Sequence, residues 1–120
     1  MDPATQPVEP RSLTAPELQR QLAEGVPLQL VDVREAAELE LARLPHPVQH
    51  LPLSRSADWM EEIEDRLEQD RPVVVVCHAG VRSWHFGCWL IQARGYRQVW
   101  NLRGGIDAWS TEVDPGVARY

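Results

Sequence analysis

The stretch VVVVCHAGVRSWHFG, residues 73–87, is the part of the sequence that best indicates the fold. Four consecutive valines are typical of a strand that is covered on both faces, as in a parallel sheet. The strand runs directly into Cys77, and four residues separate this cysteine from Arg82. Residues 83–94 are apolar nearly all round, which predicts a deeply packed helix that ends at Gly95. The stretch therefore predicts a strand, a tight loop that begins with a thiol, and a helix.

The segments on either side predict further strands and helices in alternation. The predicted strands are 28–33, 48–51, 72–76 and 96–102. The predicted helices are one that begins after Thr14 and ends at Gly25, followed by 34–42, 57–69, 83–94 and 104–109. Thr14 and Glu17 have the spacing of a capping box. Alternation of this kind favours an α/β fold with a parallel sheet between two layers of helices, in which ligands bind beyond the carboxyl ends of the strands.

Length and composition limit the classes of protein that fit. A chain of 120 residues suits one domain, for which we expect an irregular lead-in over 1–12, the domain itself over 13–110, and a tail over 111–120 that packs on or near it. The net charge of −6 argues against nucleic-acid binding and means that any anion site must be built locally. With two cysteines, no signal peptide and no apolar run of membrane-spanning length, we expect a cytoplasmic protein without membrane contact.

The loop after Cys77 has the composition of an anion-binding turn around a nucleophile. A nucleophilic thiolate needs stabilisation, because a free cysteine is mostly protonated at neutral pH. Loop N–H groups, the following helix N-terminus and the guanidinium of Arg82 could supply it, and Gly80 permits an inward-facing backbone. On its own, a cysteine after four valines is more typical of a plain core residue, but the glycine and arginine that follow favour a site. The expected active-site loop comprises Cys77, His78, Ala79, Gly80, Val81, Arg82 and Ser83.

Three motifs, in this order, resemble those of the rhodanese family of sulfurtransferases. VDVRE (31–35) with Glu38 resembles the first motif of the family, CHAGVRS (77–83) its active-site loop, and LRGGIDAW (102–109) its closing motif. The similarity covers roughly residues 10–110. It implies a rhodanese-like three-layer fold with a mostly parallel central sheet of about five strands flanked by helices.

Two further segments bear on this resemblance. Where the family often has glycine–histidine–isoleucine, this chain has Ala42, Arg43 and Leu44. The ending VDPGVARY (113–120) is similar to that of rhodanese modules fused to E1-like activating enzymes, which handle sulfur for cofactors or tRNA.

The resemblance implies a sulfurtransferase cycle that needs no cofactor. Cys77 would take a sulfane sulfur from a small anionic donor such as thiosulfate, carry it as a persulfide held by the loop and Arg82, and pass it to cyanide or a thiol. Asp32 and Arg34, at the end of a neighbouring strand, would support the loop through an ion pair or backbone hydrogen bonds. Two alternatives stay open. One is a persulfide-carrying relay or sensory module for a protein partner; the other is a cysteine-based phosphatase or arsenate reductase, whose loops place five residues between cysteine and arginine.

Several residues allow two interpretations. His78 could tune Cys77 or face solvent, and Ser83 could donate to the site or cap the helix. Cys88 could resolve a persulfide as a disulfide, although core filling is the favoured interpretation. The four histidines and two cysteines match no compact zinc-binding pattern, so we expect no metal.

Overall fold

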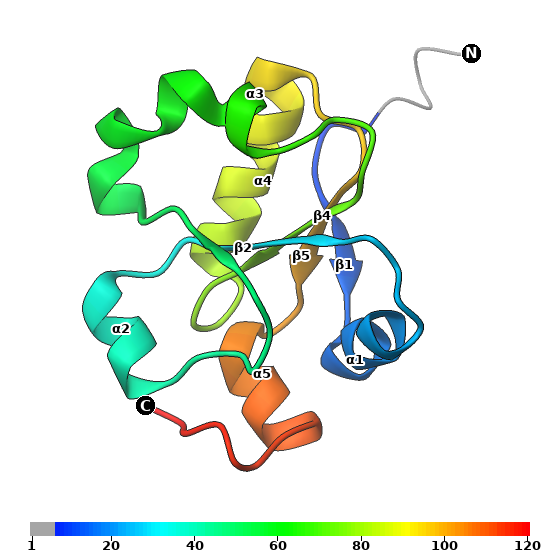
Figure 1. The fold of residues 1–120 in the computed structure, drawn as a ribbon, viewed down its shortest axis with the longest axis vertical. Helices are drawn as coiled ribbons and strands as arrows, with labels where there is room; N and C mark the ends of the chain where they lie inside the picture. The colour runs from blue at the N-terminus through cyan, green and yellow to red at the C-terminus, as the bar shows by residue number, and fades with distance from the viewer. Residues whose placement is uncertain (1–6) are drawn as a thin grey trace.

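In the computed structural model of this chain, residues 7–120 are described and form a five-stranded sheet with helices on both faces (Figure 1). The strands lie in the order β1-β5-β4-β2-β3, and all neighbours are parallel. The strands are β1 (Arg11–Leu13), β2 (Gln29–Asp32), β3 (Gln49–His50), β4 (Val73–Val76) and β5 (Val99–Leu102). The helices are α1 (Ala15–Ala23), α2 (Ala36–Leu41), α3 (Ile63–Arg66), α4 (Val81–Arg94) and α5 (Gly105–Glu112), with the 3₁₀ segments η2 (Leu53–Asp58) and η3 (Met60–Glu62). The predicted α/β class and five-stranded parallel sheet are confirmed.

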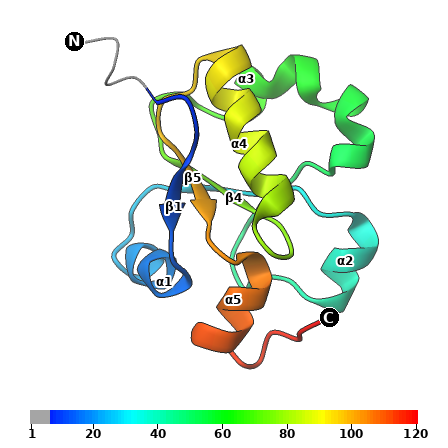
Figure 2. The same ribbon diagram turned by 180° about the vertical axis from the view of Figure 1, so that it is seen from behind.

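β4 is the central strand, and its valines point alternately into two apolar clusters. Val73 and Val75 pack with α4 and with the segment of η2, η3 and α3, whereas Val74 and Val76 pack with α1 and α5. Figures 1 and 2 show these two sets of helices on opposite sides of the sheet. Cys77 continues the alternation and joins the α4 cluster. The strand therefore delivers the thiol to the α4 side of the carboxyl edge of the sheet.

The helix starts follow from local chemistry. The predicted capping box of α1 is present: Oγ1 of Thr14 accepts from the N–H of Glu17 at 3.3 Å, and the Glu17 carboxylate accepts from the N–H of Thr14 at 3.1 Å. α4 begins at Val81, two residues before the predicted start, because Gly80 in the left-handed region turns the chain directly into the helix. Across the described part of the chain, no helix combines the length and the apolarity needed to cross a membrane.

The long helix predicted over 57–69 is wrong for most of its length. The chain instead forms η2, η3 and the single turn α3. Trp59 leaves the helical conformation, with φ −134°, and its indole packs edge-on against Phe86 and Trp89. The indole N–H also donates to the carbonyl of Pro52 at 3.1 Å. Burial of this indole against α4 outweighs the helix propensity of the acidic residues around it.

The irregular lead-in predicted over 1–12 is corrected at its end, while residues 1–6 lie outside the described part of the chain. Arg11 and Ser12 belong to β1, which pairs with β5 at the edge of the sheet. Leu13 completes this strand and is buried. Three residues are too few to show the alternation that identifies a strand, and tertiary pairing alone reveals this one.

Candidate active site

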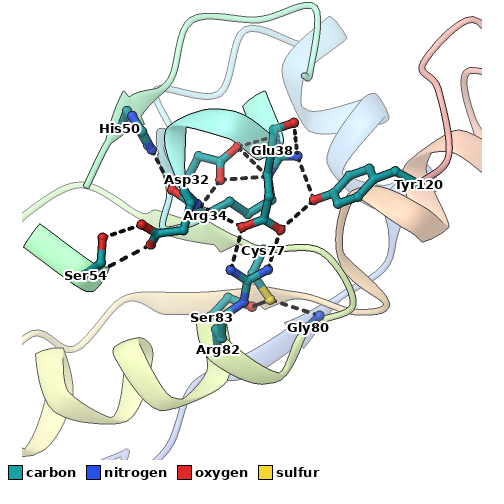
Figure 3. A network of polar contacts seen from close by, with 11 residues as sticks. Asp32, Arg34, Glu38, His50, Ser54, Cys77, Gly80, Arg82, Ser83 and Tyr120 are labelled. Atoms are coloured by element: carbon teal, nitrogen blue, oxygen red, sulfur yellow. Dashed lines mark hydrogen bonds and ion pairs between the residues drawn. The ribbon is translucent and has the colours of Figure 1, made fainter. Parts of the chain in front are cut away.

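Cys77 lies at the carboxyl end of β4, where the chain turns into α4 (Figure 3). Its side chain is 1% exposed, and the N–H of Gly80 donates to Sγ at 3.1 Å. Gly80 has φ +100°, a backbone conformation that favours glycine. Among the described residues, Gly80 provides the one backbone N–H that donates to Sγ, whereas the sequence predicts several such donors. The loop therefore curls around the sulfur, as expected, but with fewer donors.

Ser83 and Asn101 extend the contacts of Cys77 into a closed ring of hydrogen bonds. Oγ of Ser83 lies 3.2 Å from Sγ and donates to Oδ1 of Asn101 at 2.5 Å. Nδ2 of Asn101 donates to the carbonyl of Gly80 at 2.9 Å, and the N–H of Gly80 leads back to Sγ. Ser83 is fully buried and makes no capping bond to α4. Its hydroxyl therefore contacts the thiol and does not cap the helix.

The N-terminus of α5 holds the other side of the loop. The N–H of Ile106 donates to the carbonyl of Cys77 at 2.9 Å, and the N–H of Asp107 donates to the carbonyl of His78 at 3.1 Å. This approach requires Gly105, because a Cβ there would lie 2.3 Å from the carbonyl oxygen of His78. The glycine pair that resembles the closing family motif thus lets backbone donors of α5 reach the loop.

The guanidinium of Arg82 is paired with a carboxylate. Its two terminal nitrogens donate to the two oxygens of Glu38 on α2, each at 2.8 Å (Figure 3). These bonds lower the pKa of Glu38 to about 2, against the opposing effect of burial. They also raise the pKa of Arg82. The sequence predicts that the positive charge of Arg82 stabilises the Cys77 thiolate, but in the structure a carboxylate balances this charge.

Asp32 and Arg34 form a buried ion pair at the carboxyl end of β2. Nη2 of Arg34 lies 2.8 Å from Oδ2 of Asp32, and the two side chains are 0% and 1% exposed. The Asp32 carboxylate also accepts from the backbone N–H of Arg34, which ends the strand. Nη1 of Arg34 donates to Oη of Tyr120 at 3.0 Å and to the carbonyl of Glu38 at 3.4 Å. The pair is thus connected to the loop through Tyr120 and Glu38.

The segment that follows α5 packs against the loop. The ring of Tyr120 stacks on the imidazole of His78, with centroids 4.2 Å apart and planes 15° apart. Oη of Tyr120 donates to Oε1 of Glu38 at 2.9 Å. Burial raises the pKa of the Tyr120 phenol, which keeps this donor protonated. Arg119 pairs with Asp107 at 2.8 Å. His78 is therefore a partly covered residue whose ring contacts Tyr120.

In the described part of the chain, none of the remaining candidate residues makes a hydrogen bond to the sulfur. Ala79 and Val81 are exposed, Val81 to 65%. Cys88 is half-buried on α4, and burial raises the pKa of its thiol, which disfavours the thiolate that a resolving role would need. Nowhere in residues 7–120 do three or more His, Cys, Asp or Glu side chains gather so that they could hold a metal ion.

Three residues of the site were not expected from the sequence. Glu38 belongs to the first family motif, but the motif gives it no role in the site, and Asn101 lies near the end of the last predicted strand, where no pattern marks it. Tyr120 ends a segment whose similarity to other rhodanese modules was noted. Their spacing along the chain gave no sign of contact, because Glu38 and Tyr120 lie 44 and 42 residues from the loop residues that they touch, Arg82 and His78.

Comparisons with known proteins show the family of the chain. The model of the family "Rhodanese-like domain" matches residues 14–112. The chain is 40% identical over 101 residues to a "Sulfurtransferase" of Allochromatium vinosum, covering 84% of this chain and 89% of that protein. It is 39% identical over 92 residues to "Rhodanese-like/PpiC domain-containing protein 12, chloroplastic" of Arabidopsis thaliana, covering 77% of this chain. The crystal structure of a rhodanese-like domain protein from Staphylococcus aureus superimposes with a TM-score of 0.70 and 29% identity, covering 92% of this chain and 98% of that one.

Several relatives are much longer than this chain. It spans 30% of the Arabidopsis thaliana protein and 21% of "Adenylyltransferase and sulfurtransferase UBA4" of Candida albicans, to which it is 35% identical over 94 residues, or 76% of this chain. The family match covers β2 to β5, the loop after β4 and all three family motifs. The chain belongs to the rhodanese-like domain family.

Proposed function

We propose that the protein transfers sulfane sulfur through a persulfide on Cys77. The observation that carries this proposal is the position of Sγ, which lies at the end of the central strand in contact with the N–H of Gly80 and the hydroxyl of Ser83. The loop places only four residues between Cys77 and Arg82, so it closes around a single sulfur atom more tightly than a phosphatase loop closes around a phosphoryl group. The name of the Allochromatium vinosum relative, "Sulfurtransferase", supports the same reaction class, and the chain covers 89% of that protein.

The cycle conserves charge and needs no external oxidant or reductant. The Cys77 thiolate attacks the outer sulfur of thiosulfate, a new S–S bond forms, and sulfite leaves with the electron pair of the broken bond. The enzyme then carries a Cys77 persulfide anion. Cyanide or an acceptor thiolate attacks its terminal sulfur, and the Cys77 thiolate leaves and is regenerated. The N–H of Gly80 donates to Sγ at 3.1 Å, and this contact supports the thiolate to which the cycle returns.

Intact-mass analysis tests this function directly. After incubation with thiosulfate, the wild-type chain should gain the mass of one sulfur atom, and cyanide should remove it. Cys77→Ser should gain nothing, whereas Cys88→Ser should behave as the wild type, because Cys88 lies outside the ring of contacts around Sγ. Sulfur that loads onto Cys77→Ser would remove Cys77 from the mechanism, and sulfur that fails to load onto Cys88→Ser would show that Cys77 does not act without Cys88.

A persulfide relay that serves a sulfur-accepting protein is the second candidate. The paired state of Arg82 favours it, because the guanidinium of the loop is already bonded to the Glu38 carboxylate and is less available to a small anion. The relative named as adenylyltransferase and sulfurtransferase joins two such activities in one protein, which fits the relay. A relay would load sulfur but discharge it slowly to cyanide and rapidly to its partner. Both cysteines are free, which fits a reducing compartment such as the cytoplasm.

A further inference from the structure

Two arginines near the loop are each paired with a carboxylate. Arg34 is bonded to Asp32, and Arg82 is bonded to Glu38. These two pairs carry no net charge, although the reaction proposed above takes an anionic donor. The chain as a whole carries a net charge of −6, so its overall field does not attract anions either.

Four hydrogen bonds hold the carboxylate of Glu38 in place. Oε1 accepts from Nη2 of Arg82 at 2.8 Å and from Oη of Tyr120 at 2.9 Å. Oε2 accepts from Nη1 of Arg82 at 2.8 Å and from the N–H of Glu35 at 2.9 Å. The last bond belongs to the capping box that starts α2. The α2 capping box and Tyr120 therefore hold the Glu38 carboxylate in position, in addition to the two bonds from Arg82.

A donor anion that uses Arg82 must compete with this carboxylate. A forked guanidinium–carboxylate pair satisfies the same donors that a sulfonate group would occupy. An anion that binds beside the intact pair instead meets the negative charge of Glu38 at close range. Because the pKa of Glu38 is about 2, this charge persists at every pH at which a cysteine can react. A dianion such as thiosulfate is disfavoured more than a donor with one charge.

We propose that Glu38 is a specificity-determining residue, which pairs with Arg82 and thereby lowers the use of small dianionic sulfur donors relative to donors of lower charge. The inference rests on the proposed sulfur transfer, and Glu38 acts through Arg82 without touching the reacting sulfur. The preferred donor class is a persulfide or thiosulfonate of single charge, including a persulfide borne by another protein.

The matched variants are Glu38→Gln and Glu40→Gln. Glutamine keeps the size of the side chain and can still accept the capping bond from Glu35. Glu40 lies exposed on the same helix, so its variant makes the same change in net charge away from Arg82. With thiosulfate, Glu38→Gln should lower KM by about five- to ten-fold and leave kcat within about two-fold, because an anion contact with Arg82 is released. Benzenethiosulfonate, a monoanion, should show a smaller fall in KM, and Glu40→Gln should show none.

A second measurement needs no sulfur transfer. In a Cys88→Ser background, Cys77 is alkylated with anionic iodoacetate and with neutral iodoacetamide, and the ratio of the two rates reports the local charge. The ratio should rise in Glu38→Gln and stay unchanged in Glu40→Gln. Glu38→Asp, which keeps the charge but shortens the side chain by one methylene, should raise the ratio by less.

The outcomes separate the two proposals. A raised alkylation ratio in Glu38→Gln without sulfur loading in the wild type would support the proposed role of Glu38 and refute the sulfurtransferase function. Sulfur loading with an unchanged KM and an unchanged ratio in Glu38→Gln would refute the role of Glu38 and support the function. An equal response in Glu40→Gln would also refute the role of Glu38, because it would show an effect of net charge alone.

Discussion

Around Cys77, the position of one proton determines how the neighbouring side chains contact the sulfur. The hydroxyl of Ser83 has a single proton and two acceptors within reach, Oδ1 of Asn101 and Sγ. The carbonyl of Gly80 accepts from Nδ2 of Asn101, so the amide is oriented with Oδ1 toward Ser83. The hydroxyl therefore donates to Asn101 and offers Sγ a lone pair. Asn101 is thus a positioning residue that holds Ser83 and the loop as one unit.

Asn101→Ala should destabilise the protein through this ring. Asn101 is buried, and its removal leaves the hydroxyl of Ser83 and the carbonyl of Gly80 without their partners. We expect a loss of about 1–3 kcal/mol in the free energy of unfolding, measured by urea denaturation. Ser110→Ala is the control, because this buried hydroxyl donates to the carbonyl of Ile106 within α5 at 3.1 Å and reaches the carbonyl of Ala118 only at 3.5 Å, so it should lose less than about 1 kcal/mol. Equal losses of unfolding free energy in the two variants would show that the ring of hydrogen bonds contributes no more to stability than the Ser110 hydroxyl does.

The sequence predicted the residues of the site where their chemistry is local. Cys77, Gly80 and Ser83 lie within seven positions of one another, so one short motif contains the thiol and two of its contacts. The partner of Arg82 could not be predicted in this way, because Glu38 reaches it only after β2 and β4 have paired. The sequence therefore predicts Arg82 as an unpaired cation, whereas in the folded protein it forms an ion pair with Glu38.

At the scale of elements, the approach of α5 to the loop depends on the absence of one side chain. Gly105→Ala should lower the free energy of unfolding by at least about 3 kcal/mol, because its Cβ would overlap the carbonyl groups of Cys77 and His78 and φ is +63°. Gly95→Ala is the matched control: φ is +77°, but nothing lies within 4 Å of the added Cβ, so a loss of about 1–2 kcal/mol is expected. Urea denaturation of both variants measures the difference. Losses of equal size would mean that backbone conformation matters there and close approach does not.

Among the elements, the sequence pattern predicted α1 correctly but not the structure of 57–69. α1 was predicted with its capping box because both partners lie within one turn of each other. A helix over 57–69 was predicted because Trp59 and Ile63 lie on one apolar stripe, which suggests one continuous helical face. The chain does not form this helix. Trp59 is buried by rings on α4, and this contact breaks the helix at that residue. Periodicity describes one element at a time, so it cannot show that burial against a second element will interrupt the first.

At the scale of the whole molecule, the segment after α5 runs back from the end of that helix and ends beside α2, as both ribbon views show (Figures 1 and 2). Val117 is buried in the α5 cluster, and Arg119 pairs with Asp107 on α5. Tyr120 then contacts α2 through Glu38, the end of β2 through Arg34, and the loop through His78. One residue thereby connects three parts of the site that the sheet only places near one another.

Loss of Tyr120 should loosen the loop more than it destabilises the fold. Tyr120→Phe keeps the stacking on His78 but leaves the buried Arg34 and the half-buried Glu38 each without one partner, so the free energy of unfolding should fall by about 1–2 kcal/mol. Tyr120→Ala also removes the stacking, and the amides of 77–80 should then exchange with solvent faster by hydrogen exchange, because the loop loses its outer contact. Tyr96→Phe is the control, since its hydroxyl donates to the carbonyl of Leu67 away from the loop; it should cost similar stability without changing exchange at 77–80. Exchange at 77–80 that is the same in Tyr120→Ala as in Tyr96→Phe would mean that α5 and the Asn101 ring hold the loop without help from this segment.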